Sequence, residues 1–147
     1  MPAQCPFTMS VIFRAISRLE AEARQDGLPP VCLAVCNAHG ELLHFSRMDG
    51  APARVIAIAQ GKAYTAARMG TPTAALARRL KDEELTLADF CDPGLTAMRG
   101  GLPLCCETGV QLAVGVSGRR TEDDERLAAR LLDILREEAA RHTNAKT

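Results

Sequence analysis

The chain has 147 residues, which suits one domain that buries about two-thirds of its unfolded surface around a single core. Its 18 basic and 18 acidic residues cancel, so no global field attracts nucleic acid or an anionic membrane. Only 3% of residues are aromatic and Trp is absent, which removes the usual stacking platforms for single-stranded nucleic acid. We therefore predict a single domain over residues 1–147, with no nucleic-acid partner and no membrane partner.

The N-terminal residues lack the basic head and the long apolar run of a secretion signal. No apolar stretch approaches the length needed to span a membrane. The sequence contains 6 Cys, which without an export signal are expected to stay reduced. These features predict a cytoplasmic protein.

The first half of the chain reads as helix, hairpin and two helices. Apolar residues at helical spacing predict a helix over residues 10–26 that ends at Gly27. Short apolar runs at 31–36 and 42–47 flank a turn and predict a β-hairpin. Pro52 suits the first turn of a second helix that stops near Gly70, and a short third helix follows.

In the second half, the pattern weakens between residues 82 and 101, where we expect a loop with at most one short strand at 96–99. Runs at 102–106 and 110–117 predict another hairpin, whose last strand is expected to be central. Acidic residues then mark the start of a C-terminal helix. This order predicts an antiparallel sheet sandwiched between helices, a fold that is α/β by its layers and α+β by its connectivity.

Charged residues follow the second predicted strand directly, where the chain turns toward a helix. Arg47 offers a planar fork of donors and Asp49 an acceptor. The pair either locks the turn internally or holds a polar ligand.

The second predicted helix carries Lys62, Tyr64 and Thr65, which supply one cation and two hydroxyls within a short span. Lys62 is either a solvated side chain or a ligand anchor. If this helix faces the Gly100-Gly101 loop, then Lys62, Arg47 and exposed backbone N–H groups can hold a carboxylate.

Four motifs of this sequence resemble the GlcG/HbpS family, which includes the C-terminal domain of PduO-type corrinoid adenosyltransferases. They are Arg47-Met48-Asp49-Gly50-Ala51, Lys62-Ala63-Tyr64-Thr65-Ala66, Gly100-Gly101-Leu102-Pro103-Leu104 and Val114-Gly115-Val116-Ser117-Gly118. The resemblance implies a profilin-like, five-stranded antiparallel sheet flanked by helices, a homo-oligomer, and the heme binding described for several members. The ligand-binding residues expected from the motifs are Arg47, Asp49, Lys62, Tyr64, Thr65, Gly100, Gly101 and Pro103.

Heme requires an apolar slot and usually an axial ligand such as His, Cys, Met or Tyr. The N-terminal helix contains no His, unlike that of some family members. His44 shares a strand face with Leu42 and Ser46, and it either points into a cleft or is a half-buried structural residue. Cys106 is either a packed thiol or a thiolate ligand. Both are candidate axial ligands.

Residues 122–125 have the E-x-x-E spacing of some iron-binding surfaces, but acids at a helix start are already favoured by the helix dipole. No zinc-type cysteine cluster, phosphate loop or nucleophile elbow is present. Our first hypothesis is a cytoplasmic binding protein for heme or a related tetrapyrrole, accessory to a catabolic pathway. The alternative is an enzyme or accessory protein acting on a small organic carboxylic acid bound near Arg47 and Lys62. A third is a purely structural oligomer subunit.

Overall fold

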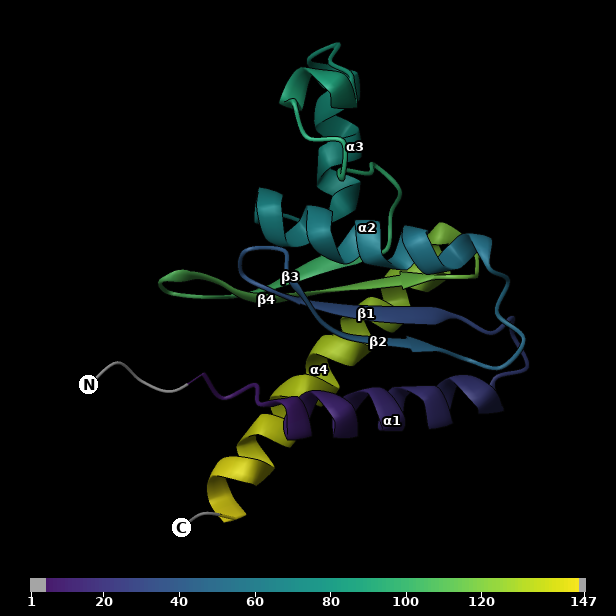
Figure 1. Cartoon of the computed structure of the whole chain (residues 1–147), viewed down its shortest axis with the longest axis vertical. Helices are drawn as coiled ribbons and strands as arrows, with labels where there is room; N and C mark the ends of the chain where they lie inside the picture. The colour runs from purple at the N-terminus through teal and green to yellow at the C-terminus, as the bar shows by residue number, and fades with distance from the viewer. Residues whose placement is uncertain (1–4, 146–147) are drawn as a thin grey trace.

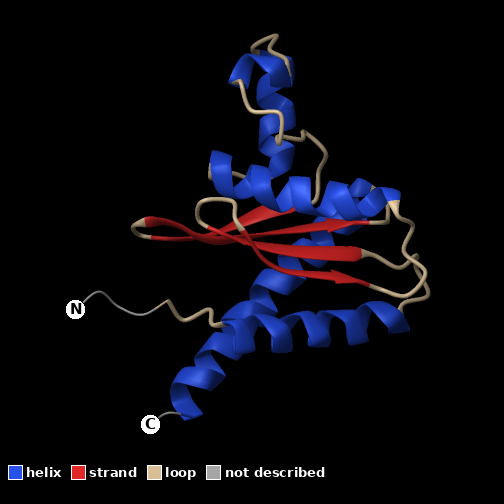
Figure 2. Ribbon diagram, in the orientation of Figure 1, coloured by secondary structure: helices blue, strands red, loops and turns tan. Residues whose placement is uncertain are grey.

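The computed structural model describes residues 5–145, which form one layered α+β unit. The elements are α1 (Met9–Gln25), β1 (Cys32–Asn37), β2 (Leu42–Arg47), α2 (Arg54–Met69), α3 (Thr73–Asp82), the 3-10 turn η1 (Leu87–Phe90), β3 (Gly101–Cys106), β4 (Gly109–Ser117) and α4 (Thr121–Ala145). The strands pair antiparallel in the order β2-β1-β4-β3. Helix α2 covers one face of the sheet, while α1 and α4 cover the other (Figures 1 and 2).

The predicted antiparallel sheet between helices is confirmed, and β4 is central as expected. The expected fifth strand is wrong, because the described residues form a sheet of four strands. Residues 96–99 contain no strand. Their backbone donors bond to side chains instead of to a neighbouring strand: Thr96 N donates to Thr65 Oγ1 at 2.9 Å, and Met98 N donates to Thr96 Oγ1 at 3.3 Å.

The two faces of the sheet differ in side-chain size. Large aliphatic residues of β1 and β4 face α1 and α4 and build the main core with them. Small residues on the same two strands face α2 and form a second, thinner core. The large set is Leu33, Val35, Leu112, Val114 and Val116; the small set is Cys32, Ala34, Cys36, Ala113 and Gly115.

A row of very small residues runs across the sheet beneath α2. Ala34 pairs with Gly115, and Gly115 pairs with Gly101 on the next strand. A Cβ added at Gly115 would meet the backbone of α2 at Ala59 and Ala63, inside any permitted contact distance. A Cβ at Gly101 would likewise collide with the carbonyl oxygen of Lys62. The helix backbone therefore lies directly on the sheet at this point.

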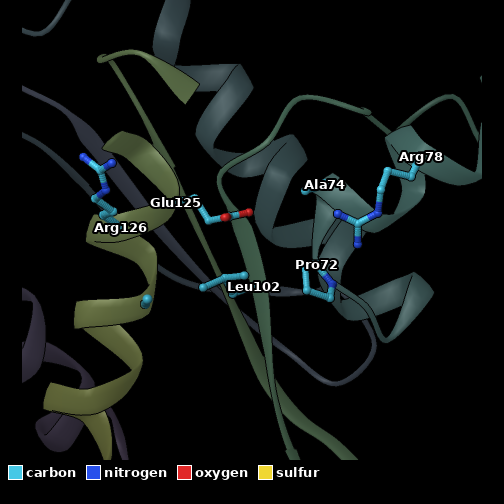
Figure 3. A pocket seen from close by; sticks show the side chains of 7 residues that line it. Pro72, Ala74, Arg78, Leu102, Glu125 and Arg126 are labelled. Atoms are coloured by element: carbon cyan, nitrogen blue, oxygen red, sulfur yellow. The ribbon is translucent and has the colours of Figure 1, made fainter. Parts of the chain in front are cut away.

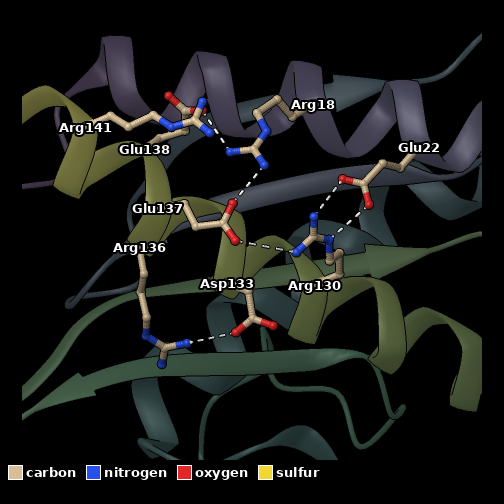
Figure 4. A network of polar contacts seen from close by, with 8 residues as sticks. All are labelled: Arg18, Glu22, Arg130, Asp133, Arg136, Glu137, Glu138 and Arg141. Carbon is tan, nitrogen blue, oxygen red and sulfur yellow. Dashed lines mark hydrogen bonds and ion pairs between the residues drawn. The ribbon is translucent and has the colours of Figure 1, made fainter.

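Helices α1 and α4 are joined on the opposite face by a network of ion pairs (Figure 4). Arg18 bonds Glu137 at 2.8 Å and Glu138 at 2.9 Å, and Arg130 bonds Glu22 at 2.9 Å. Glu138 is buried, and the other members are partly or largely exposed. Because exposed ion pairs contribute little, the apolar contact beneath the network supplies most of the stability of this helix pair.

Arg119 closes the C-terminal end of α1, a role that its sequence position does not reveal. Its guanidinium donates to the carbonyl oxygens of Ala23 at 3.1 Å and Pro29 at 2.7 Å, and it pairs with Asp26 at 2.6 Å. Its side chain is only 3% exposed. One buried cation thus satisfies a free carbonyl at the end of α1 and fixes the loop that leads into β1.

The close approach of α2 predicts opposite effects for two glycine-to-alanine changes. Gly115→Ala should lower the free energy of unfolding by about 3 kcal/mol or more, because backbone atoms of α2 occupy the space of the new methyl group. Gly61→Ala, within α2, should raise it by about 1 kcal/mol, because the added Cβ makes only ordinary contacts, with Thr96 Cγ2 at 3.6 Å and Gly94 O at 3.9 Å, and helix propensity improves. Urea denaturation measures both; equal effects would contradict the close contact.

Candidate functional site

Lys62 belongs to α2, and its fully buried side chain points between β4 and α4. Its Nζ donates to the carbonyl oxygen of Val116 at 2.8 Å and to Asp124 Oδ2 at 3.1 Å. Asp124 Oδ1 accepts a further hydrogen bond from Arg119 N at 3.0 Å. Lys62 is therefore not solvated, and its ammonium group is held inside the protein.

Burial acts in opposite directions on the two members of this pair. It lowers the pKa of Lys62 and raises that of Asp124, since each charged form loses hydration. Their mutual attraction opposes both shifts. The pair joins the middle of α2 to the first turn of α4.

Arg47 locks its own turn, which is the internal alternative considered from the sequence. Its Nε and Nη2 donate to the carbonyl oxygen of Ala51 at 3.0 and 2.8 Å. Among the described residues no bond joins Arg47 to Asp49, whose side chain is exposed. The lock is thus made by a backbone carbonyl and not by the carboxylate.

Hydrogen bonds of Thr65 and Gly101, two residues of the motifs, hold the 94–101 loop against α2 and α3. Thr65 Oγ1 donates to the Gly61 carbonyl oxygen at 2.7 Å and accepts from Thr96 N at 2.9 Å. Gly101 N donates to Thr73 Oγ1 at 3.0 Å. A Cβ at Gly100 would stand 2.8 Å from Lys62 Nζ, so this glycine makes room for the buried ammonium group. Pro103 lies half-buried on the edge strand β3.

Tyr64 belongs to a separate polar cluster on the outer side of α2. Its hydroxyl donates to Asp92 Oδ2 at 2.7 Å, and the guanidinium of Arg68 lies 5.7 Å from the centre of its ring. Arg68 Nε is 3.8 Å from the same carboxylate oxygen. The hydrogen bond lowers the pKa of Asp92 and raises that of Tyr64.

Three adjoining depressions surround this cluster, with volumes of about 390, 420 and 390 Å³. Pro93 lines all three of them, Tyr64 lines two, and Cys91, Asp92 and Leu95 also line two. We call this region the Tyr64 groove. Two of the three depressions have mainly apolar walls, whereas the one that holds Tyr64, Arg68 and Asp92 is mainly polar. The apolar lining residues are Leu42, Ala57, Leu87, Ala88, Phe90 and Leu95.

The Tyr64 groove also contains side chains that can ligate iron, namely Cys36, Tyr64, Met69 and Cys91. Burial raises the pKa of Cys36 to about 11, which keeps it a neutral thiol. Cys91 is exposed and has the left-handed backbone conformation, with φ of 54°. Sequence reasoning missed Cys91 and Asp92, because nothing in a loop rich in turn residues shows which helix it packs against.

The two axial ligands expected from the sequence lie elsewhere. The His44 ring meets Phe13 of α1 edge-on, with ring centroids 6.3 Å apart. Leu43 is an extra residue in β2, so Leu42 and His44 face opposite sides, which corrects the regular alternation assumed above. Cys106 is exposed at the β3–β4 turn, with Sγ 3.1 Å from Thr108 Oγ1. Since β2 and β3 are opposite edges of the sheet, both residues of one chain do not meet at one iron.

Three acidic residues at the start of α4 are paired with cations. Asp123 bonds Arg126 at 2.9 Å and Glu125 bonds Arg99 at 2.9 Å, while Asp124 holds Lys62. Over residues 5–145, no group of three or more His, Cys, Asp or Glu side chains is arranged to hold a metal ion. In the same part of the chain, no helix has the length and apolar character required to cross a membrane.

The fold is an α+β sheet covered by helices on both faces, and the four motifs lie on its elements. Comparison of the sequence with protein families identifies the family. The profile of the HbpS-like family, described as haem-degrading proteins, matches residues 7–133. The chain belongs to this family. No curated protein matches the chain by sequence.

Solved structures with the same fold support this assignment. A double mutant of Streptomyces reticuli HbpS is 29% identical, with a TM-score of 0.79 and coverage of 92% of this chain and 90% of that chain. The Klebsiella pneumoniae protein ORFY is 26% identical, with a TM-score of 0.78 and coverage of 87% and 89%. A PduOC–heme complex is 22% identical with a TM-score of 0.71, covers 86% and 90%, and shows likeness of fold alone.

The buried ion pair predicts a large loss of stability when the lysine alone is removed. Lys62→Met should lower the free energy of unfolding by about 3–5 kcal/mol, because Asp124 then keeps an uncompensated buried charge. Lys62→Met combined with Asp124→Asn should lose less, since the amide oxygen still accepts from Arg119 N. Arg130→Met, at an exposed pair, should cost about 1 kcal/mol or less. Urea denaturation that ranks these variants differently would contradict the assignment.

Cys36 predicts a specific pH dependence. Its folded pKa, about 11, exceeds the ordinary 9.0, so the folded protein keeps a proton that the unfolded chain loses between these values. This contribution is fully present below pH 9 and should fall by about 2–3 kcal/mol as the pH rises through 11. Unfolding free energies of the wild type and Cys36→Ala, compared between pH 8 and 11, measure it. Parallel pH profiles would refute it, and Cys105→Ala, at an exposed thiol, is the matched control.

Proposed function

We propose that this protein binds heme or a related tetrapyrrole in the Tyr64 groove. Membership of the HbpS-like family supports the ligand class. The observation that carries the location is the coincidence of apolar walls, iron-ligating side chains and a cation in adjoining depressions. In this proposal the protein acts in the cytoplasm, as a homo-oligomer and as an accessory to a catabolic pathway.

The groove fits the chemical parts of a tetrapyrrole. Phe90, Pro93 and Leu95 offer apolar surface for a flat ring that extends over more than one depression. Arg68 is 52% exposed, and its ion pair with Asp92 is long, at 3.8 Å. The guanidinium can therefore turn toward a propionate. Cys91 is the most accessible thiol of the groove and is the axial ligand of this proposal. A bound heme would supply the iron chemistry.

The carboxylic-acid alternative receives less support from the geometry. It requires Arg47 and Lys62 to hold one ligand, yet both cations already bond internal acceptors, Ala51 O and Asp124 respectively. Lys62 is fully buried and would have to give up its bond to Asp124 before it could bind an acid. Arg47 keeps donors beyond those that bond Ala51 O, so it could bind an acid only without Lys62. We therefore place the ligand on the outer side of α2.

A hemin titration followed by absorbance tests the proposal. We expect a saturable, shifted Soret band for the wild type, and loss of the thiolate-type spectrum in Cys91→Ala. His44→Ala, Cys106→Ala and Cys105→Ala should bind like the wild type, because these residues lie outside the Tyr64 groove.

The outcomes separate the ligand from its location. A titration that resembles free hemin with nonspecific adsorption would refute tetrapyrrole binding. A shifted band that survives in Cys91→Ala but disappears in His44→Ala or Cys106→Ala would support tetrapyrrole binding and refute the Tyr64 groove as its place. Decay of the band under reductant and oxygen would show turnover of the ligand.

A further inference from the structure

A second pocket, separate from the Tyr64 groove, lies between α3, β3 and the first turns of α4 (Figure 3). Its volume is about 400 Å³, within the usual range of small-molecule sites. Pro72, Ala74, Leu102 and Ala129 supply apolar lining. None of these residues lines the Tyr64 groove.

Two opposite charges face each other across this pocket. Figure 3 shows the guanidinium of Arg78, from α3, and the carboxylate of Glu125, from α4, pointing toward one another over Leu102. Arg126 also lines the pocket, but its side chain points away from the centre and bonds Asp123 at 2.9 Å. The pocket therefore has one cationic side, one anionic side and an apolar floor.

Neither facing charge is fully satisfied by the protein. Arg78 makes no ion pair or hydrogen bond within residues 5–145, whereas its neighbour Arg79 pairs with Glu83 at 2.7 Å and lies over the ring of Phe90. Glu125 uses Oε1 to accept from Arg99 at 2.9 Å. This bond leaves Oε2 as an acceptor, and the side chain is 23% exposed.

The geometry points to a binding site for a small zwitterion, a molecule with a carboxylate at one end, an ammonium group at the other and a short apolar body between them. The carboxylate would accept a charge-assisted bond pair from Arg78, and the ammonium group would donate to Glu125 Oε2. The body would lie on Leu102, Pro72 and Ala74. This inference is independent of tetrapyrrole binding.

The opposed charges give this site a selectivity that a single charge would not. A simple carboxylate would bind Arg78 but leave its apolar tail against Glu125. A simple amine would bind Glu125 but leave its apolar tail against Arg78. Each loses one charge-assisted interaction and desolvates a carboxylate or guanidinium without compensation. Only a molecule with both groups at the correct separation satisfies both walls.

The test is calorimetry of the full chain with a ladder of ω-amino acids from glycine to 6-aminohexanoate. We expect one length to bind at least about tenfold more tightly than the alkanoate and the alkylamine of equal length, since each lacks one charge-assisted bond. The preferred length then measures the separation of the two charges. Equal affinity for zwitterion, alkanoate and alkylamine, or no heat with any of them at millimolar concentration, would overturn the inference.

Matched variants assign the two walls. Arg78→Gln should weaken the best zwitterion about tenfold or more, while Arg79→Gln, one residue along α3, should not change its affinity. Glu125→Gln should have an effect similar to Arg78→Gln, and Arg99→Gln should leave binding in place, because it removes the partner of Glu125 but not the carboxylate. Equal losses for Arg78→Gln and Arg79→Gln, or for Glu125→Gln and Arg99→Gln, would overturn the inference. Circular dichroism confirms that each variant is folded.

Discussion

The contact between the backbone of α2 and the small-residue row Ala34, Gly115 and Gly101 is the constraint on which the remaining structure depends. It brings the helix so close that no side chain fits between the helix and the two glycines. At this contact the side chain of Lys62 is fully buried and reaches the Val116 carbonyl oxygen and Asp124. The buried ion pair lies beside the close contact and connects α2 to the first turn of α4.

The motifs that identify the family therefore build a frame more than they line a cavity. Lys62, Thr65 and Gly101 connect α2, the loop before β3 and α4 through bonds that are satisfied internally. The accessible hollows lie outside this frame, one where α2 meets the irregular segment 87–95 and the other between α3, β3 and α4. The Tyr64 groove and the Arg78–Glu125 pocket differ in character, since one offers iron ligands on apolar walls and the other offers opposed charges.

Sequence periodicity predicted the helices and both hairpins, because buried faces leave a strong signal at helical or alternating spacing. The wrong fifth strand came from the family resemblance, whereas the pattern itself left at most one short strand at residues 96–99. The bonding of backbone donors there to Thr65 and Thr96 is a tertiary effect that periodicity does not show. Periodicity also placed Leu42 on the face of His44 and Ser46, whereas a single inserted residue in β2 puts Leu42 on the other face. Tyr64 was identified as a site candidate, but its partner Asp92 was not, since their proximity depends on how the 87–95 segment folds over α2.

The unequal faces of the sheet also guard against errors in folding. A slip of one residue between β1 and β4 would exchange the two faces and present Val114 or Val116 to α2. The helix backbone leaves no room there even for a methyl group, so a misaligned sheet could not accept α2 at all. A mispaired intermediate would keep its apolar surface exposed and remain free to separate and pair again. The glycines beneath α2 thus act as a steric checkpoint on strand pairing, in addition to their role in the finished fold.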